Sequence, residues 1–203
     1  MKVLIGCEFS GVVREAFRKK GHDAWSCDLL DAEDGSKYHI KDDVLNRLND
    51  GFGLAVFHPP CTYMCNSGVT WLKDEMRWPE LQKANEFFHK LWNAPIPQIA
   101  IENPIPHKYA LLPKYTQIIQ PYEFGHPERK ATCLWLKNVP PLKPTKDVKK
   151  EMELLPKNIA QRIHYTSPGK DRWKIRSKTF QGIAEAMAEQ WGNLRMAYIS
   201  EVM

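Results

Sequence analysis

The sequence lacks any run of the ~20 apolar residues that a membrane-spanning helix requires. Its opening residues, 1–11, enter a strand-like pattern directly, without the long apolar stretch and small-residue cleavage site of a signal peptide. It also lacks the Gly-x-Gly-x-x-Gly turn of dinucleotide-binding enzymes, which argues against NAD as a cofactor. These absences predict a cytoplasmic protein that does not contact the membrane.

Cysteine is sparse, and its spacing argues against the sites that use it in pairs. The five cysteines are odd in number and include no Cys-x-x-Cys pair, so in a reducing compartment we expect free thiols. Cys61 and Cys65 are four residues apart with His58 close by, but structural zinc usually takes two close pairs. The second pair is missing, and we therefore predict no metal site.

The chain has 203 residues, enough for one domain, or one domain with a modest appendage, that buries its core without a disulfide or metal. Its net charge of +5 is unevenly placed. Residues 140–178 contain eleven Lys or Arg and four Asp or Glu, a net charge of +7, whereas the rest of the chain is nearly neutral. A basic segment on a neutral body indicates a polyanionic partner, and the alternative is a solvated surface loop.

Short apolar runs alternate with helical patterns over the first half of the chain. Strands are predicted over residues 2–6, 22–27, 54–57, 99–101, 115–119 and 131–136. Helices are predicted over residues 10–20, from residue 42 onward, over 78–92, over 180–191 and near 148–155. This alternation predicts an α/β fold with a mostly parallel central sheet flanked by helices.

Polar and reactive side chains cluster where the predicted strands end. In open parallel sheets, ligands bind beyond the carboxyl ends of the strands. Four clusters fall at such ends: Phe9-Ser10-Gly11, Asp28, His58-Pro59-Pro60-Cys61 and Glu102-Asn103-Pro104. Their shared position at one edge of the sheet makes them the candidate functional site.

A glycine turn and two acidic residues indicate a binding site for a nucleoside. Gly11, between a strand and a helix, lets a ligand approach the backbone, and the helix N-terminus offers free N–H donors. Asp28, which ends the second strand, suits the hydroxyl pair of a ribose, and Asp43 suits the amino group of an adenine. Together they predict a nucleoside cofactor without a pyrophosphate. The alternative for each acid is helix capping or turn formation.

Cys61 is the candidate nucleophile. Two prolines fix the loop before it, and a thiol on such a loop can be aimed at a substrate. The thiolate is the attacking species, so a nearby cation or helix terminus has to lower the pKa of the thiol. The alternative is a buried, inert cysteine. Glu102, at an equivalent strand end, favours the first interpretation, since a carboxylic acid there could protonate a ring nitrogen as the thiolate adds.

Taken in chain order, these residues resemble the DNA cytosine carbon-5 methyltransferases that use S-adenosylmethionine. Phe9-Ser10-Gly11 is similar to the family's cofactor turn, Pro60-Cys61 to its nucleophile loop and Glu102-Asn103 to its Glu-Asn pair. Further similarities are Asp28, Asp43-Val44, the segment Phe124-Gly125-His126-Pro127 and the closing segment from Ser177 to Ala188. Each match is weak alone, but together they run in family order over nearly the whole chain.

The resemblance implies a Rossmann-like, S-adenosylmethionine-dependent methyltransferase fold and methylation of cytosine in DNA. In that reaction Cys61 adds to carbon 6 of a flipped-out cytosine, Glu102 protonates a ring nitrogen, and Asn103 orients the loop and contacts the base. The methyl group then reaches carbon 5, and loss of the carbon-5 proton releases the cysteine. The implied cofactor residues are Phe9, Ser10, Gly11, Asp28, Asp43, Val44 and Pro59.

Two departures from the family concern substrate binding. The family's Gln-x-Arg-x-Arg segment corresponds to residues 128–132, where Lys130 supplies one cation, Arg129 is one residue off register and Thr132 replaces an arginine. The family's large target-recognition domain is replaced by the short basic interval 138–176, which predicts weak specificity or help from a partner protein or a homodimer. The residues of this part predicted to bind nucleic acid are Arg172, Trp173, Lys174 and Arg176, although Trp173 as a simple loop anchor is the alternative.

The expected division of the chain has three parts: a catalytic core over residues 1–137, a basic segment over 138–178 and a C-terminal helix over 179–203 that packs back on the core.

Other functions are left open by these residues. RNA or a free pyrimidine nucleotide could be the substrate, and a degenerate protein that only binds cofactor, nucleic acid or a partner is the non-enzymatic alternative. An exocyclic-amine methyltransferase has an Asp/Asn-Pro-Pro-aromatic loop, in which His58 and Cys61 are poor substitutes. A zinc deaminase is rejected, because no His-x-Glu precedes Cys61 and the following spacing is Pro-Cys-x-x-x-Cys.

Overall fold

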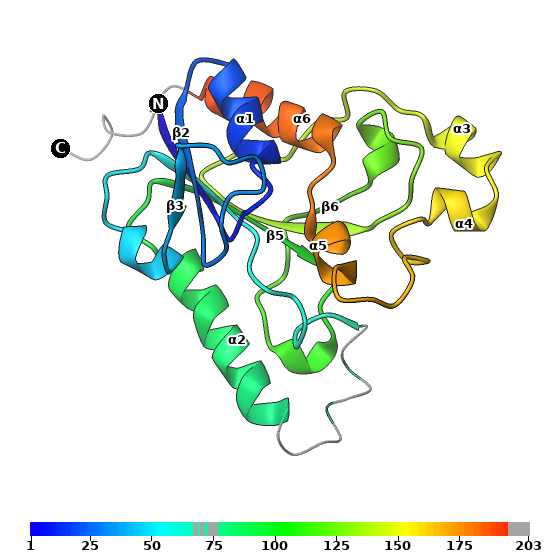
Figure 1. The fold of residues 1–203 in the computed structure, drawn as a ribbon, viewed down its shortest axis with the longest axis horizontal. Helices are drawn as coiled ribbons and strands as arrows, with labels where there is room; N and C mark the ends of the chain where they lie inside the picture. The colour runs from blue at the N-terminus through cyan, green and yellow to red at the C-terminus, as the bar shows by residue number, and fades with distance from the viewer. Residues whose placement is uncertain (67–68, 70–71, 73–76, 195–203) are drawn as a thin grey trace.

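The computed structural model describes residues 1–203 except 67–68, 70–71, 73–76 and 195–203. A seven-stranded sheet forms its centre, in the order β3-β2-β1-β4-β5-β7-β6 (Figure 1). The strands are β1 (Lys2–Gly6), β2 (Asp23–Asp28), β3 (His39–Lys41), β4 (Leu54–Phe57), β5 (Gln98–Pro104), β6 (Gln117–Ile119) and β7 (Thr132–Lys137). Only β7 runs antiparallel to its neighbours, β5 and β6. The predicted α/β, Rossmann-like fold with a mostly parallel sheet is confirmed.

Helices cover both faces of this sheet (Figure 1). The α-helices are α1 (Val12–Lys19), α2 (Arg77–Trp92), α3 (Lys149–Glu153), α4 (Lys157–Ala160), α5 (Arg172–Ser177) and α6 (Gln181–Gly192), and the short 3-10 helices are η1 (Val44–Arg47), η3 (Lys108–Ala110) and η4 (Pro121–Glu123). α1 and α6 pack together against one face, and α2 lies against the other. Within the described ranges, no helix combines the length and apolar character needed to cross a bilayer.

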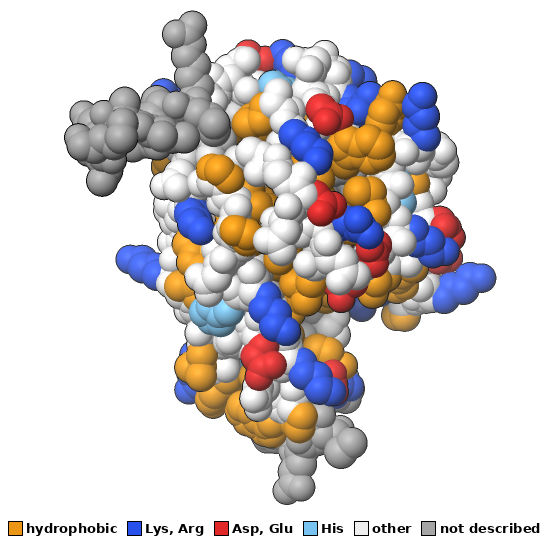
Figure 2. Space-filling model, turned by 90° about the vertical axis from the view of Figure 1, so that its left-hand side faces the viewer, with side chains coloured by type: hydrophobic (Ala, Val, Ile, Leu, Met, Phe, Trp, Pro, Cys, Tyr) orange, Lys and Arg blue, Asp and Glu red, His pale blue; other side chains and the backbone are white. Residues whose placement is uncertain are grey.

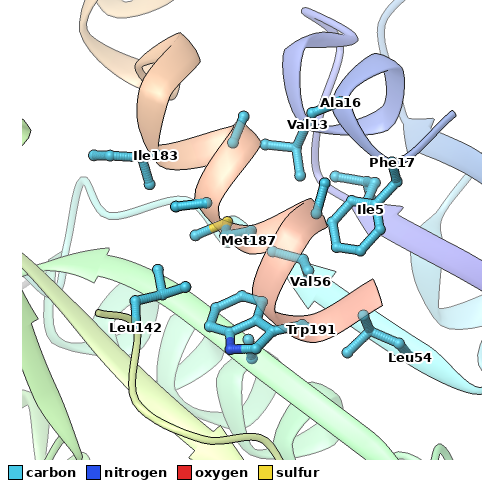
Figure 3. Packing of buried hydrophobic residues seen from close by; sticks show 14 of the residues in the cluster. Ile5, Val13, Ala16, Phe17, Leu54, Val56, Leu142, Ile183, Met187 and Trp191 are labelled. Atoms are coloured by element: carbon cyan, nitrogen blue, oxygen red, sulfur yellow. The ribbon is translucent and has the colours of Figure 1, made fainter. Parts of the chain in front are cut away.

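Alternate residues of the central strands enter two separate cores. In β1, Val3 and Ile5 belong to the cluster beneath α1 and α6, whereas Leu4 between them belongs to the cluster beneath α2. All three side chains are fully buried, which is the pattern of a parallel sheet covered on both faces. Figure 3 shows the first cluster, where Met187 and Trp191 of α6 point toward the sheet. With both faces covered by helices, the carboxyl ends of the parallel strands lie together at one edge of the sheet.

The basic segment 138–178 starts inside the first core. Leu142 is 2% exposed and packs in that cluster, and its carbonyl oxygen accepts a hydrogen bond from Gln117 Nε2 at 2.7 Å. The rest of the segment carries α3, α4 and α5 along the right-hand side of Figure 1. On the opposite side of the molecule, seen in Figure 2, Lys and Arg side chains are interspersed with Asp and Glu. Residues 195–203 of the predicted C-terminal part lie outside the described residues.

Replacing Trp191 with alanine should destabilise the protein by about 3–5 kcal/mol, the range for truncating a large buried aromatic side chain. Trp191 is 0% exposed, and its indole N–H donates to the Pro140 carbonyl oxygen at 2.9 Å. The variant therefore loses both core packing and the link between α6 and residue 140. Urea denaturation of the wild type, Trp191→Ala and the exposed control Glu185→Ala would measure this change. A loss below about 1 kcal/mol for Trp191→Ala would contradict the packing described here.

Candidate active site

A pocket of about 120 Å³ opens at the carboxyl edge of the sheet. Its lining comes from the ends of β1, β4 and β5, from the loop before β7, and from the last residues of α5 and the two that follow. Its lining residues are Cys7, Glu8, Phe9, Ser10, His58, Pro59, Pro60, Cys61, Glu102, Pro104, Lys130, Arg176, Ser177, Lys178 and Thr179. The sequence-predicted residues Phe9, Ser10, Pro59, Cys61, Glu102, Lys130 and Arg176 thus meet around one space.

The Pro-Pro-Cys loop is held in place from two sides. Where β4 ends, His58 N–H donates to the Gly6 carbonyl oxygen at 2.9 Å, which continues the pairing with β1 for one residue. The side-chain amide of Asn103, 2% exposed, donates to the Pro59 carbonyl oxygen at 3.0 Å. Because prolines donate no backbone hydrogen bond, this contact from β5 fixes a stretch that the sheet itself cannot hold. The structure thus places Asn103 behind the loop rather than on the pocket wall.

Cys61 lies on the pocket wall next to a second thiol. A hydrogen bond with Cys65 and burial of the side chain raise the pKa of the Cys61 thiol far above its usual value, while the charge of Lys130 acts in the opposite direction. Cys61 therefore carries its proton at neutral pH in the ligand-free protein. A thiolate nucleophile requires a cation or a helix terminus that lowers this pKa. Lys130 acts in that direction, but the hydrogen bond with Cys65 and burial outweigh it. Its Nζ donates to the Arg176 carbonyl oxygen at 3.0 Å, which holds the ammonium group at this wall.

Glu102 is engaged by two side chains. Its Oε2 accepts hydrogen bonds from His58 Nδ1 at 2.8 Å and from Thr179 Oγ1 at 3.1 Å. Burial acts to raise the pKa of Glu102, but the hydrogen bond and charge of His58, followed by Lys130 and Thr179, lower this pKa to about 2. Glu102 is therefore a carboxylate at neutral pH. The expectation that it supplies its own proton to a ring nitrogen needs correction, because the proton has to come from a neighbour.

Glu8 is a site residue that sequence reasoning missed. Its carboxyl group is buried and accepts the backbone N–H groups of Val13 at 2.7 Å and Arg14 at 3.2 Å, at the N-terminus of α1. Burial raises the pKa of Glu8, although His58 and these two N–H groups oppose the shift. Since these donors are already used, this helix end offers little to a phosphate. The available signal was an acid directly before the Phe9-Ser10-Gly11 turn.

The predicted cofactor turn has the expected backbone form. Gly11 precedes α1 with φ of +73°, in the left-handed region where a side chain would be strained. Asp28 ends β2 and Asp43 follows β3, and the two segments are joined by Asp42 N–H, which donates to the Asp28 carbonyl oxygen at 3.1 Å. Burial raises the pKa of Cys7, and the charges of Asp28 and Asp43 raise it further. One oxygen of each accepts a local N–H, from Leu30 at 3.0 Å and from Leu45 at 2.9 Å. These two acids and Gly11 lie outside the lining of the 120 Å³ pocket.

Val44 is buried in the second core, 4% exposed, so it presents little surface to a ligand. The helix expected from residue 42 is the single 3-10 turn η1, for which Asp43 is the N-cap. Asp43 therefore does the capping work that the sequence allowed as its alternative role.

Part of the basic segment covers the pocket. Trp173 of α5, half exposed, packs against Phe9 with 5.7 Å between ring centroids, and Lys178 pairs with Glu33 at 2.7 Å. The first contact joins the segment to the turn after β1, and the second joins it to the connection between β2 and β3. Trp173 thus anchors its helix over the cofactor turn, as its alternative role predicted, and still leaves half of its surface open.

The remaining predicted nucleic-acid residues lie away from the pocket wall. Arg129 is exposed, Arg172 Nε donates to the Thr166 carbonyl oxygen at 2.8 Å, and Lys174 lies 3.7 Å from Asp171. Thr132, where the family has an arginine, is 3% exposed in β7. Of the cations predicted to bind nucleic acid, the structure places Lys130 and Arg176 on the pocket wall.

The segment Phe124-Gly125-His126-Pro127 joins the start of α6. Gly182 N–H donates to His126 Nε2 at 2.9 Å, and a Cβ at position 182 would lie 2.0 Å from the Phe124 carbonyl oxygen. Only glycine permits this approach. The two segments that resemble the family's motifs are therefore in direct contact, and they bring Thr179 to Glu102.

Among the residues described, no group of three His, Cys, Asp or Glu side chains could hold a metal ion, and none of the five cysteines forms a disulfide.

Comparisons with known proteins give little guidance. No protein-family model matches the chain, and no curated protein matches it. One solved structure that it resembles is described provisionally as a DNA modification methyltransferase encoded within an E. coli prophage, with 14% identity and a TM-score of 0.45. The match covers 67% of this chain and 46% of that chain. A likeness at this level does not bear on activity.

Proposed function

We propose that the protein is an S-adenosylmethionine-dependent methyltransferase that methylates carbon 5 of cytosine in DNA, with Cys61 as the covalent nucleophile. The observation that carries the proposal is that Cys61 and Glu102 line one pocket, together with the Phe9-Ser10 turn. A thiol and a carboxyl group facing the same space are what addition to a pyrimidine ring requires. Pro104 and Pro60 supply apolar surface beside them.

The residues present fit this cofactor. S-adenosylmethionine is a nucleoside with a cationic sulfonium and an ammonium group and no phosphate. The donors at the N-terminus of α1 are occupied by Glu8, which disfavours a phosphate and places an acid beside the pocket. Asp28 and Asp43 at the neighbouring strand ends would hold the ribose and the adenine. When bound, the cofactor supplies an electrophilic methyl group.

The protein's own groups would then act on the base. Cys61 adds to carbon 6 once a substrate displaces the hydrogen bond with Cys65 and Lys130 stabilises the thiolate. The electrons of the ring double bond move toward a ring nitrogen, which takes a proton from the Glu102 side of the pocket. Carbon 5 becomes nucleophilic and accepts the methyl group. Loss of the carbon-5 proton expels Cys61.

A second candidate substrate is RNA or a free pyrimidine nucleotide. The observation that favours it is the small covering segment: among the described residues, Arg176 of this segment and Lys130 of the loop before β7 are the only predicted nucleic-acid side chains that line the pocket. A cover of this size offers little surface for reading a DNA sequence.

Methyl transfer from labelled S-adenosylmethionine to duplex DNA, tRNA and dCMP would test the proposal. We expect label at carbon 5 of cytosine in duplex DNA, located by nuclease digestion and mass spectrometry. Label only in tRNA or dCMP would favour the second substrate class. Label on the exocyclic amine, or none on any substrate, would contradict the proposal.

A further inference from the structure

His58 is the residue of the pocket that the proposed reaction has not used. Its Nδ1 lies 2.8 Å from Glu102 Oε2, and the two side chains are 11% and 10% exposed. Both line the pocket that holds Cys61. His58 therefore contacts Glu102, the one acid that the proposed reaction places beside the ring nitrogen of the substrate.

The other ring nitrogen of His58 has no hydrogen-bond partner. Nε2 is buried, and no group within the described residues bonds to it. A buried polar atom without a partner destabilises the folded protein, so such atoms usually mark a functional group or a site for a ligand or water. His58 also lines the pocket, so its ring lies beside the space that a substrate would fill.

The charges around His58 favour its protonated form. Glu102 faces it from β5 and Glu8 faces it from the turn between β1 and α1, while Lys130, from the loop before β7, opposes them. Burial acts to lower the pKa of His58, but the hydrogen bond and charge of Glu102 and the charge of Glu8 raise it above the usual 6.5. The same contact keeps Glu102 ionised. The shared proton of this pair thus rests on the histidine.

We propose that His58 holds the proton that Glu102 delivers to the pyrimidine ring, so that His58 acts through Glu102 as a proton-storing and positioning residue. The inference rests on the proposed function. As the Cys61 sulfur bonds to carbon 6, the ring double bond shifts and a lone pair forms on the ring nitrogen. That nitrogen takes a proton from Glu102, and the Nδ1 proton of His58 moves to Glu102. When Cys61 leaves, the proton returns by the same path.

This role differs from that of a plain structural ion pair. A purely structural pair needs no open space beside it, whereas His58 and Glu102 both line the pocket, and the second ring nitrogen of His58 is buried without a partner among the described residues. Thr179 supports the arrangement, because its hydroxyl group donates to the same Glu102 oxygen and so fixes the acid between the histidine and the pocket. The substrate ring would complete this set of contacts.

The protonation state of His58 can be measured without activity. In ¹⁵N-labelled protein near pH 7, we expect the His58 ring to show two protonated nitrogens, and Glu102→Gln to shift its titration to lower pH. His58→Asn would assign the His58 signals by their loss, and His89→Asn, on α2, would serve as the control that removes a histidine without touching the pocket. A neutral His58 ring at pH 7 in the wild type would overturn the inference, whatever the enzyme assays show.

The catalytic test uses His58→Asn, because asparagine keeps a donor toward Glu102 but holds no transferable proton. We expect turnover to fall at least about 10²-fold, with little change in the KM for S-adenosylmethionine. The wild-type rate should decline as pH rises through the raised pKa of His58, and this alkaline decline should be absent from the variant. His89→Asn should keep the wild-type rate and profile.

The two hypotheses fail in different ways. A wild-type protein without methyl transfer contradicts the proposed function, and the NMR titration still decides the protonation of the pair. An active wild type whose His58→Asn variant keeps both its rate and its alkaline decline refutes the proton-storing role alone.

Discussion

Cys61→Ala should abolish the covalent adduct that the wild type forms with 5-fluorocytosine DNA in the presence of S-adenosylmethionine. Fluorine at carbon 5 cannot leave as a proton does, so the thioether at carbon 6 stays in place after methyl transfer. The alanine variant has no sulfur on this wall of the pocket, and we expect turnover on normal DNA to drop by about 10³-fold or more. A denaturing gel and mass spectrometry of the tryptic peptide would detect the adduct.

Cys65→Ala is the matched comparison for this experiment. It removes the neighbouring thiol and its hydrogen bond, which is the largest cause of the raised pKa of Cys61. The adduct should still form, and alkylation of Cys61 should extend to lower pH as this pKa falls. An adduct that persists in Cys61→Ala, or one mapped to Cys65, would show that the wrong cysteine has been assigned as the nucleophile.

Glu102→Gln should lower turnover by about 10²- to 10⁴-fold, the usual range for a proton-transfer group. Glutamine has the same shape and can still accept a hydrogen bond from His58, but it cannot pass a proton to the ring. Binding of S-adenosylmethionine, measured by calorimetry, should change little because the predicted ribose and adenine contacts lie at the ends of other strands. Equal losses of cofactor binding and turnover would instead indicate a damaged pocket.

The same variant should flatten the dependence of stability on pH. The pKa of Glu102 falls from 4.5 to about 2 on folding, so its contribution is full above pH 4.5 and is lost as pH falls toward 2. The pKa of His58 is raised above 6.5, so its contribution is full below pH 6.5 and is lost as pH rises through the raised value. The pair should stabilise the protein most between these limits. Urea denaturation across this pH range, for the wild type and Glu102→Gln, would measure the effect.

The central strands could be predicted because a strand that is buried on both faces is a continuous run of apolar residues. Leu54–Phe57 has the predicted bounds, and β1 does too. The strand β3, His39–Lys41, was missed because three partly exposed residues at a sheet edge carry no apolar pattern. β5 extends to Pro104 rather than ending at residue 101, because antiparallel pairing with β7 continues past the last pair with β4. Such pairing depends on strands far apart in the sequence.

The site could be predicted only in part, for a related reason. Strand-end position brought Cys61 and Glu102 to one edge, and both line the same pocket. Which groups surround them depends on contacts between distant segments. Thr179, which bonds to Glu102, is 77 residues from it in the sequence, and His58 is 44 residues from it. Periodicity and motifs do not contain that information, so the ionised state of Glu102 could not be foreseen.

The acid at the start of α1 has a practical consequence for ligand design. Helix N-termini elsewhere receive the phosphates of nucleotides, but in this protein Glu8 fills that position from within. Compounds built on ATP or NAD would meet repulsion and find no free amide there. Adenosine analogues that end in an amine should bind instead, and swapping that amine for a phosphate should remove their affinity.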